Sequence, residues 1–129
     1  MPQSRDKRAI GSIGEEATAG FLAANGYEIL ERNYTIRGGE IDIIARKNGV
    51  LCFVEVKTRK VGAMVSGECS VTMKKRRFIV RTAERYHREY VKRFGETKCR
   101  FDVASVVLEN GRIKQARYYV AAFNASGDH

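Results

Sequence analysis

Apolar residues recur at helical spacing in two segments of the chain, residues 8–25 and residues 72–94. In the first segment Ile10, Ile13, Ala17, Phe21 and Ala24 lie three or four residues apart. In the second segment Ile79, Ala83, Tyr86, Tyr90 and Phe94 form a similar stripe. Asn25 with Gly26 and then Gly95 supply stop signals, and Thr72 suits an N-cap. The pattern therefore predicts two helices, each with one buried face.

Alternating apolar residues predict strands between and after these helices. Residues 27–35 read as an outer strand, residues 40–59 as a central hairpin and residues 100–120 as a second hairpin. Residues 60–71 lack a sustained period and are expected to form a loop, and residues 124–129 a disordered tail. The order predicts a single α/β domain over residues 1–129, with a mixed central sheet flanked by helices.

Two Asn-Gly pairs, at residues 48–49 and 110–111, fix the register of the two hairpins, because Asn-Gly between apolar runs favours a two-residue turn. In the first hairpin this turn places Asp42 opposite Glu55 and Glu40 opposite Lys57. In the second hairpin it places Leu108 opposite Ile113 and Val103 opposite Tyr118. The acidic residues of the first hairpin should share one face of the sheet, since side chains alternate along a strand.

Directly opposed Asp42 and Glu55 carboxylates are destabilising unless a cation lies between them, because opposed Cβ atoms are roughly 4.5–5.5 Å apart. The other face of this hairpin is apolar and should be buried. It carries Ile41, Ile43, Ala45, Cys52, Val54 and Val56. Mg²⁺ or Mn²⁺ suits such a site, because it binds to carboxylate and carbonyl oxygens. We therefore expect the metal to bind to Asp42, Glu55 and the carbonyl oxygen of Val56.

Lys57 follows Glu55 by two residues and so lies on the same face of the strand. There its ammonium could hold a water molecule and stabilise charge on a phosphoryl oxygen, an arrangement that suits phosphodiester hydrolysis. An isolated Glu-x-Lys in a strand is usually an exposed ion pair. The apolar neighbours Phe53, Val54 and Val56 and the opposed carboxylate favour the catalytic interpretation here.

The chain has 129 residues and a net charge of +9, with a pI of about 9.7. Such a charge favours polyanionic partners, above all nucleic acid. Basic residues line the predicted second helix opposite its apolar stripe. They are Lys74, Lys75, Arg77, Arg81, Arg85 and Arg88. This surface is either a nucleic-acid-binding face or a solvated helix face, whereas Tyr86, Tyr90 and Phe94 are expected in the core.

Cysteine and histidine usage predicts neither a disulfide framework nor a zinc site. The three cysteines are unpaired in spacing and there are two histidines. No apolar run approaches the ~18 residues of a transmembrane helix, and the N-terminus lacks the apolar core of a secretion signal. We therefore expect a cytoplasmic protein with no membrane partner. Asp102 is interpreted as a structural ion-pair partner of Arg100 or another cation, and Glu15 as either a site residue or a solvated helix charge.

Motifs along nearly the whole chain resemble the YraN family of small bacterial proteins. They are Gly14-Glu15, Gly26-Tyr27, Gly39-Glu40-Ile41-Asp42, Phe53-Val54-Glu55-Val56-Lys57 with Arg59, Val71-Thr72 with Lys75, Arg100-Phe101-Asp102-Val103 and Ala122-Phe123. The pattern is also similar to the restriction-endonuclease-like superfamily and to archaeal Holliday junction resolvases. This resemblance implies a restriction-endonuclease-like fold, with Asp42 and Glu55 as metal ligands, Lys57 as the catalytic lysine and Glu15 as a carboxylate from the first helix.

The residues and the resemblance together predict a nuclease that depends on Mg²⁺ or Mn²⁺ and hydrolyses DNA, with branched or flapped DNA as a possible preference. DNA is favoured over RNA as the partner. A resolvase-like mechanism implies two sites and hence a homodimer. The alternative is a nucleic-acid-binding accessory protein with little or no intrinsic cleavage.

Overall fold

A computed structural model describes residues 3–62 and 72–125, with side chains from Arg8 onward. Its elements follow the predicted order of helix, strand, hairpin, helix and hairpin. They are α1 (Gln3–Ala24), β1 (Glu28–Ile36), β2 (Gly39–Lys47), β3 (Val50–Lys60), α2 (Met73–Phe94), β4 (Lys98–Glu109) and β5 (Arg112–Phe123). Most of the predicted loop over residues 60–71 and of the predicted tail over 124–129 falls outside the described residues. No described helix is long and apolar enough to cross a membrane.

The five strands form one mixed sheet in the order β1-β2-β3-β4-β5. The β3–β4 pair is parallel and the other neighbouring pairs are antiparallel. Parallel neighbours need a crossover connection, and α2 lies in the connection between β3 and β4. The prediction of an α/β fold with a mixed central sheet is therefore confirmed.

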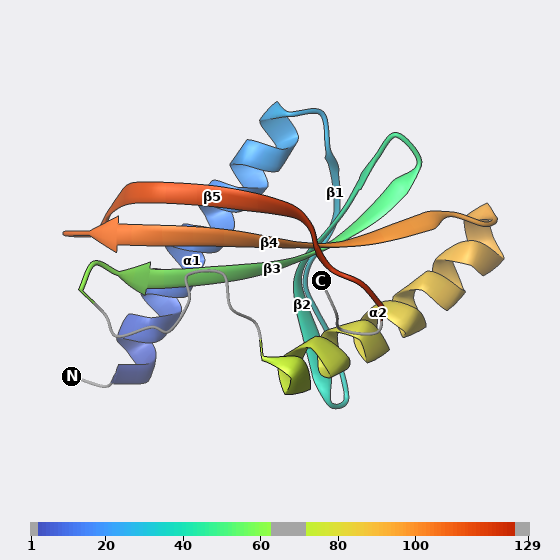
Figure 1. Cartoon of the computed structure of the whole chain (residues 1–129), viewed down its shortest axis with the longest axis horizontal. Coiled ribbons are helices and arrows are strands. Elements are labelled where there is room, and N and C mark those ends of the chain that lie inside the picture. Colours follow the sequence, from blue (N-terminus) through green and yellow to red (C-terminus); the bar gives the residue numbers. More distant parts are fainter. Residues whose placement is uncertain (1–2, 63–71, 126–129) are drawn as a thin grey trace.

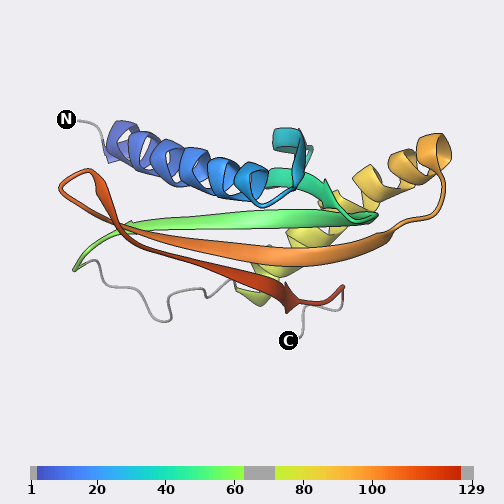
Figure 2. The same ribbon diagram turned by 90° about the horizontal axis from the view of Figure 1, so that it is seen from above.

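The two helices cover opposite faces of the sheet (Figures 1 and 2). Leu22 of α1 packs in a cluster with Val54 of β3, whereas Ile79 of α2 packs in another cluster with Phe53. Because Phe53 and Val54 are consecutive residues of one strand, their side chains point to opposite faces. Strand β3 is thus buried between the helices, which explains its long apolar run.

The first hairpin has the predicted register from its turn inward. Lys47 pairs with Val50 and Ile43 pairs with Val54. Asn48 and Gly49 have φ angles of 51° and 76°, as a two-residue type I′ turn requires. This part of the prediction is confirmed. Cys52 is fully buried in this hairpin, as expected, and both it and Cys99 carry free thiols.

The second hairpin corrects the predicted pairing by one residue. Leu108 pairs with Ile113 as predicted, but Val103 pairs with Tyr119 rather than Tyr118. The register shifts between Val107 and Leu108, because one extra residue of β5 enters the ladder as a β-bulge. Tyr118 consequently pairs with Ala104.

Two aromatic residues assigned to the predicted apolar helix stripes are more exposed than expected. Phe21 of α1 is 47% exposed, and the buried face of that helix instead consists of Gly14, Thr18 and Leu22. Phe94, in the last turn of α2, is 60% exposed. Burial of α1 therefore depends on small residues that permit close approach to the sheet, which a count of large apolar residues does not reveal.

Asp102 of β4 is completely buried and accepts three kinds of hydrogen bond. The Arg100 guanidinium donates from Nε at 2.9 Å, the Tyr118 hydroxyl donates at 2.6 Å, and the Ala121 backbone N–H donates at 2.9 Å. The prediction that Asp102 pairs with Arg100 in a structural ion pair is confirmed. This network links the edge strand β5 to its neighbour β4.

Helix α2 meets β2 at Gly39, where the two elements are too close for a side chain. A Cβ atom at Gly39 would lie 2.0 Å from Oγ1 of Thr82 and 3.2 Å from the carbonyl oxygen of Phe78. Thr82 is itself fully buried. Glycine at this position therefore lets the first half of α2 lie directly against the start of β2, next to the acidic residues Glu40 and Asp42.

Candidate active site

The candidate site begins where β2 and β3 separate. The ladder between these strands ends at the pair Ile43 and Val54, one step before Asp42 and Glu55. The backbone N–H of Val56 donates a hydrogen bond of 2.7 Å to Oδ2 of Asp42. The carboxylate thus satisfies a backbone donor near the end of the ladder, as a buried N–H group requires.

This separation also corrects the predicted face of Ile41. We expected Ile41 to share a face with Ile43, yet Ile41 packs with Ile44 and with Ile79 of α2. Ile43 packs with Leu22 of α1 on the other side of the sheet. The change of face occurs around Asp42, where regular alternation along β2 is interrupted.

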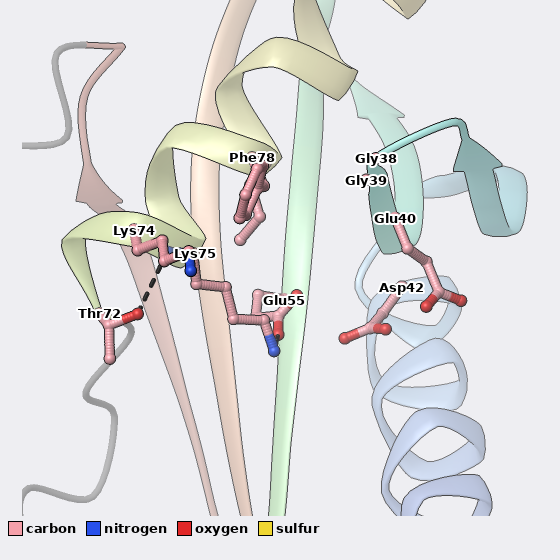
Figure 3. A pocket seen from close by; sticks show the side chains of 10 residues that line it. Gly38, Gly39, Glu40, Asp42, Glu55, Thr72, Lys74, Lys75 and Phe78 are labelled. Carbon is pink, nitrogen blue, oxygen red and sulfur yellow. Dashed lines mark hydrogen bonds and ion pairs between the residues drawn. The ribbon is translucent and has the colours of Figure 1, made fainter.

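A cavity of about 370 Å³ opens beside Asp42 and Glu55, between the start of β2, the middle of β3 and the first turns of α2. Its walls are Gly38, Gly39, Glu40, Asp42, Glu55, Thr72, Lys74, Lys75, Phe78 and Ile79. Figure 3 shows carboxylates entering the cavity from the two strands, with Lys75 extending from the helix toward Glu55. The cavity thus lies between acidic residues of β2 and β3 and basic residues in the first turn of α2.

The Asp42 and Glu55 carboxylates lie together in partly buried surroundings, where a cation would offset their mutual repulsion. Glu55 is only 5% exposed. Burial, followed by the negative charge of Glu55, raises the pKa of Asp42 from 3.8 to about 7, although the Val56 N–H opposes this shift. Asp42 also hydrogen-bonds with the Glu55 carboxyl group. The Asp42 carboxyl group is therefore mostly protonated below about pH 7.

Lys75 supplies a positive charge at this pair. Its Nζ atom lies 2.5 Å from Oε2 of Glu55, while half of its side chain remains exposed. Burial lowers the pKa of Lys75, but the Glu55, Asp42 and Glu40 carboxylates outweigh this effect and raise it overall. The Lys75 backbone N–H is held by the Thr72 side chain at 3.1 Å, which confirms Thr72 as the predicted N-cap.

Comparison with known proteins identifies the family. The model of the uncharacterised protein family UPF0102 matches residues 14–106. The chain belongs to this family. It is 46% identical over 121 residues to a UPF0102 protein of Symbiobacterium thermophilum, covering 92% of this chain and 98% of the relative. A UPF0102 protein of Dictyoglomus turgidum is 41% identical over 119 residues, covering 92% of this chain and 99% of the relative.

The UPF0102 match covers β2, β3 and α2, which build the cavity, and it also includes Glu15 of α1 and Asp102 of β4. Membership confirms the resemblance to the YraN family that the sequence motifs predicted. The relatives named above are of nearly the same length as this chain, since the alignments cover almost all of each relative.

Glu15 lies close enough to Asp42 to be affected by its charge, but it lines a different cavity, which it shares with Glu16, Arg32, Asn33 and Glu40. Burial, then the negative charge of Asp42, raises the pKa of Glu15, and a hydrogen bond with Asn33 opposes this shift. Glu15 is therefore electrostatically coupled to Asp42 from the α1 side. Its neighbour Glu16 faces outward and pairs with Arg32 at 3.2 Å.

Lys57 lies two residues beyond Glu55 on β3, where it is half-buried and pairs in register with Ser105 of β4. It is not among the residues that line the cavity of Asp42, Glu55 and Lys75. The β2–β3 ladder ends before the predicted pairing of Glu40 with Lys57. The structure thus keeps Lys57 on the strand of Glu55 but further along it than the cavity.

The predicted nucleic-acid-binding residues divide into two groups. Lys74, Arg77, Arg81, Arg85 and Arg88 are exposed on α2. Arg85 pairs with Glu89 on the same face at 3.8 Å. Lys75, by contrast, points into the cavity and binds Glu55. The helix therefore presents an exposed basic surface, formed by Lys74, Arg77, Arg81, Arg85 and Arg88, that begins at the cavity.

The donor set of the cavity fits Mg²⁺ or Mn²⁺, since it brings two carboxylates together beside the backbone of Val56. Within residues 3–62 and 72–125, no group of three or more His, Cys, Asp and Glu side chains is placed to hold a metal ion. A metal here would thus use two carboxylates and complete its coordination with the Val56 carbonyl oxygen, water and substrate oxygens.

Proposed function

We propose that this chain is a nuclease that depends on Mg²⁺ or Mn²⁺ and hydrolyses DNA phosphodiester bonds. The observation that carries the proposal is the meeting of the buried Glu55 carboxylate and the half-buried Asp42 carboxylate in a cavity at the start of an exposed basic helix. A protein that needed only a stable sheet would gain nothing from two acidic groups whose burial and mutual repulsion raise the pKa of Asp42 to about 7.

In this proposal Asp42, Glu55 and the Val56 carbonyl oxygen hold the metal. The bound ion would supply Lewis-acid polarisation of a phosphoryl oxygen and a water molecule of lowered pKa. The Val56 N–H orients the Asp42 carboxylate through its 2.7 Å hydrogen bond. Asp42, whose pKa is near 7, is placed to lose its proton as the site is loaded.

The Lys57 ammonium would hold the attacking water and offset charge on the phosphoryl oxygens. In the reaction a water oxygen bonds to phosphorus and gives up a proton to solvent, the bond from phosphorus to the leaving oxygen breaks, and that oxygen takes up a proton from solvent. Lys57 would have to reach the substrate from further along β3, because it lies outside the cavity wall. A substrate strand that extends from the cavity along β3 would meet it.

DNA is the favoured substrate class because the exposed basic surface of α2 adjoins the carboxylates. Arginines along a helix bind the phosphate backbone through charge and are insensitive to sequence. A preference for branched or flapped DNA, and a homodimer that offers two such sites, follow from the resemblance to restriction-endonuclease-like proteins and archaeal resolvases. Superfamily membership is part of the same proposal.

The decisive experiment is cleavage of linear, single-stranded, flapped and four-way DNA with Mg²⁺ or Mn²⁺ at pH 8. Wild type should cleave at least one substrate, and Asp42→Asn should not, because the amide removes a metal-binding charge at nearly constant volume. Glu96→Gln is the matched control, since Glu96 is exposed in the turn between α2 and β4. Equal activity of wild type and Asp42→Asn would contradict the proposal.

A second candidate function is a nucleic-acid-binding accessory protein with little or no intrinsic cleavage. The observation that favours it is the ion pair between Lys75 and Glu55, which already neutralises one of the two carboxylates. The same set of DNA substrates distinguishes the nuclease from the accessory protein. Binding to DNA without cleavage of any substrate would favour the accessory protein.

A further inference from the structure

We propose that Lys75 is a tethered cation that takes the place of the metal in the metal-free site, and that metal binding displaces its ammonium from Glu55. This inference rests on the proposed metal-binding role of Asp42 and Glu55 and adds a regulatory step to it. The observation that carries it is the 2.5 Å contact between Nζ of Lys75 and Oε2 of Glu55, two residues that line the cavity (Figure 3).

The ion pair between Lys75 and Glu55 compensates the charge of Glu55 in the cavity and does not stabilise helix α2. Lys75 lies in the first turn of α2, three residues after the N-cap Thr72. The helix macrodipole disfavours a positive charge in this turn, and the turn contains no acidic residue. The ammonium is therefore held there by the Glu55 carboxylate, which is 5% exposed and would otherwise be an uncompensated buried charge.

The geometry also permits a divalent ion to replace the Lys75 ammonium at Glu55. Half of the Lys75 side chain is exposed, so its ammonium can move into solvent without repacking the core. Lysine is a compact charge on a flexible stem, unlike the planar guanidinium of arginine. A divalent ion that binds to Glu55 and Asp42 would remove the partner of Lys75 and repel it. The ammonium would then be free to bind a phosphate oxygen at the mouth of the cavity, beside Lys74.

Metal and lysine would therefore compete for Glu55, and the competition is measurable without any cleavage. Mn²⁺ binding to the full chain is measured by isothermal titration calorimetry for wild type, Lys75→Met, Lys75→Arg and Lys74→Met. Lys75→Met removes the competing charge at similar length. Lys74→Met is the matched control, because it changes the net charge equally, in the same turn and on the same cavity wall.

Lys75→Met should bind Mn²⁺ about tenfold tighter than wild type or more, since the displaced contact is a charge-assisted hydrogen bond. Lys75→Arg should bind no tighter than wild type. Lys74→Met should stay within about threefold of wild type, because exposed charges are screened by salt. A Lys75→Met protein with unchanged or weaker Mn²⁺ affinity would overturn the inference.

Loss of Lys75 can also prevent folding, because it leaves Glu55 buried and unpaired. In that case circular dichroism of Lys75→Met is recorded in EDTA and in Mn²⁺. Folding restored by Mn²⁺ would show that the two cations are interchangeable, and an unfolded protein in both conditions would overturn the inference.

The outcomes for the two proposals are separable. If wild type binds Mn²⁺ and cleaves DNA but Lys75→Met binds Mn²⁺ no tighter, the displacement of Lys75 is wrong and the nuclease stands. If no variant binds Mn²⁺, both proposals fail. If Lys75→Met binds Mn²⁺ tightly but wild type cleaves no DNA, the displacement stands and the nuclease activity is wrong.

Discussion

The Asp42 carboxylate of β2 accepts a hydrogen bond from the backbone N–H of Val56 on the neighbouring strand β3. The 2.7 Å hydrogen bond fixes the carboxylate beside Glu55 at the point where the β2–β3 ladder ends. Any ion that binds to Asp42 therefore binds to a group already oriented by the backbone. Such preorganisation reduces the reorganisation that accompanies binding.

The first prediction concerns the pH dependence of stability without metal. Because the pKa of Asp42 is raised from 3.8 to about 7, the folded state holds a proton that the unfolded state loses. This contribution to stability is fully present below about pH 4 and is lost as the pH rises to about 7, with a slope of at most ~1.4 kcal/mol per pH unit. Urea unfolding in EDTA should show a stability loss between pH 4 and 7 that Asp42→Asn lacks. Parallel profiles for the two proteins would contradict the prediction.

The second prediction concerns metal binding. Mg²⁺ or Mn²⁺ should raise the melting temperature of wild type through mass action. Below pH 7 the metal must displace the proton of Asp42, so affinity should fall up to about tenfold per pH unit and proton release should accompany binding. Calorimetry in two buffers of different ionisation enthalpy measures this release. Asp42→Asn and Glu55→Gln should lose most of the affinity while Glu96→Gln keeps it, and equal affinity in all four proteins would remove these residues from the site.

The third prediction concerns the exposed basic surface of α2. Reversing the charges of Arg81 and Arg85 to Glu should weaken binding to all DNA sequences alike and reduce the salt slope of log Kd by about one or more. Fluorescence anisotropy at several salt concentrations measures both. The matched control reverses Arg112 and Lys114, which are exposed on β5 and give the same change of net charge. If both double variants behave alike, only overall charge matters and α2 is a solvated face.

The fourth prediction separates catalysis from binding at Lys57. Lys57→Met should fold and should bind metal and DNA like wild type, because Lys57 lies outside the cavity wall. Its cleavage rate should fall on the order of 10²–10³, as expected when a preorganised charge is lost from the transition state. Single-turnover cleavage and anisotropy measure the two quantities. Full activity would exclude Lys57 from the reaction, and loss of folding would show a structural role instead.

The fifth prediction concerns the buried network at Asp102. Arg100→Met should destabilise the protein by about 3–5 kcal/mol, because it leaves a fully buried carboxylate without its ionic partner. Tyr118→Phe removes only one hydrogen bond to Asp102 and should cost about 1–3 kcal/mol. Urea denaturation measures both. Equal effects would mean that the ion pair adds nothing to the hydrogen bond.

Local turn chemistry made much of the fold and part of the site predictable. The Asn48-Gly49 turn alone sets the pairing that brings Asp42 toward Glu55, and the two helix stripes set the layers. The bulge of β5 was not predictable, because the extra residue near Lys114 follows an equally regular Asn-Gly turn. A local signal for a hairpin therefore guarantees the register only for the first pairs.

The sequence predicts that Lys75 binds nucleic acid. It does not predict that the Lys75 side chain enters the cavity. Its position depends on how α2 crosses from β3 to β4, which is a long-range property of the packing. One signal was available, namely the N-cap Thr72, which places Lys75 in the first turn, where a positive charge is unfavourable. A lysine in that place without an acidic neighbour on its own helix indicates a partner elsewhere in the fold.

The contact at Gly39 has a mechanical consequence for substrate recognition. Because the Gly39 backbone packs directly against the Thr82 side chain and the Phe78 carbonyl oxygen, the start of β2 and the first half of α2 are held in close contact beside the carboxylates. A nucleic acid that binds to both must adapt its own shape to this fixed spacing, so selectivity would come from how easily the substrate bends or opens rather than from closure of the protein around it.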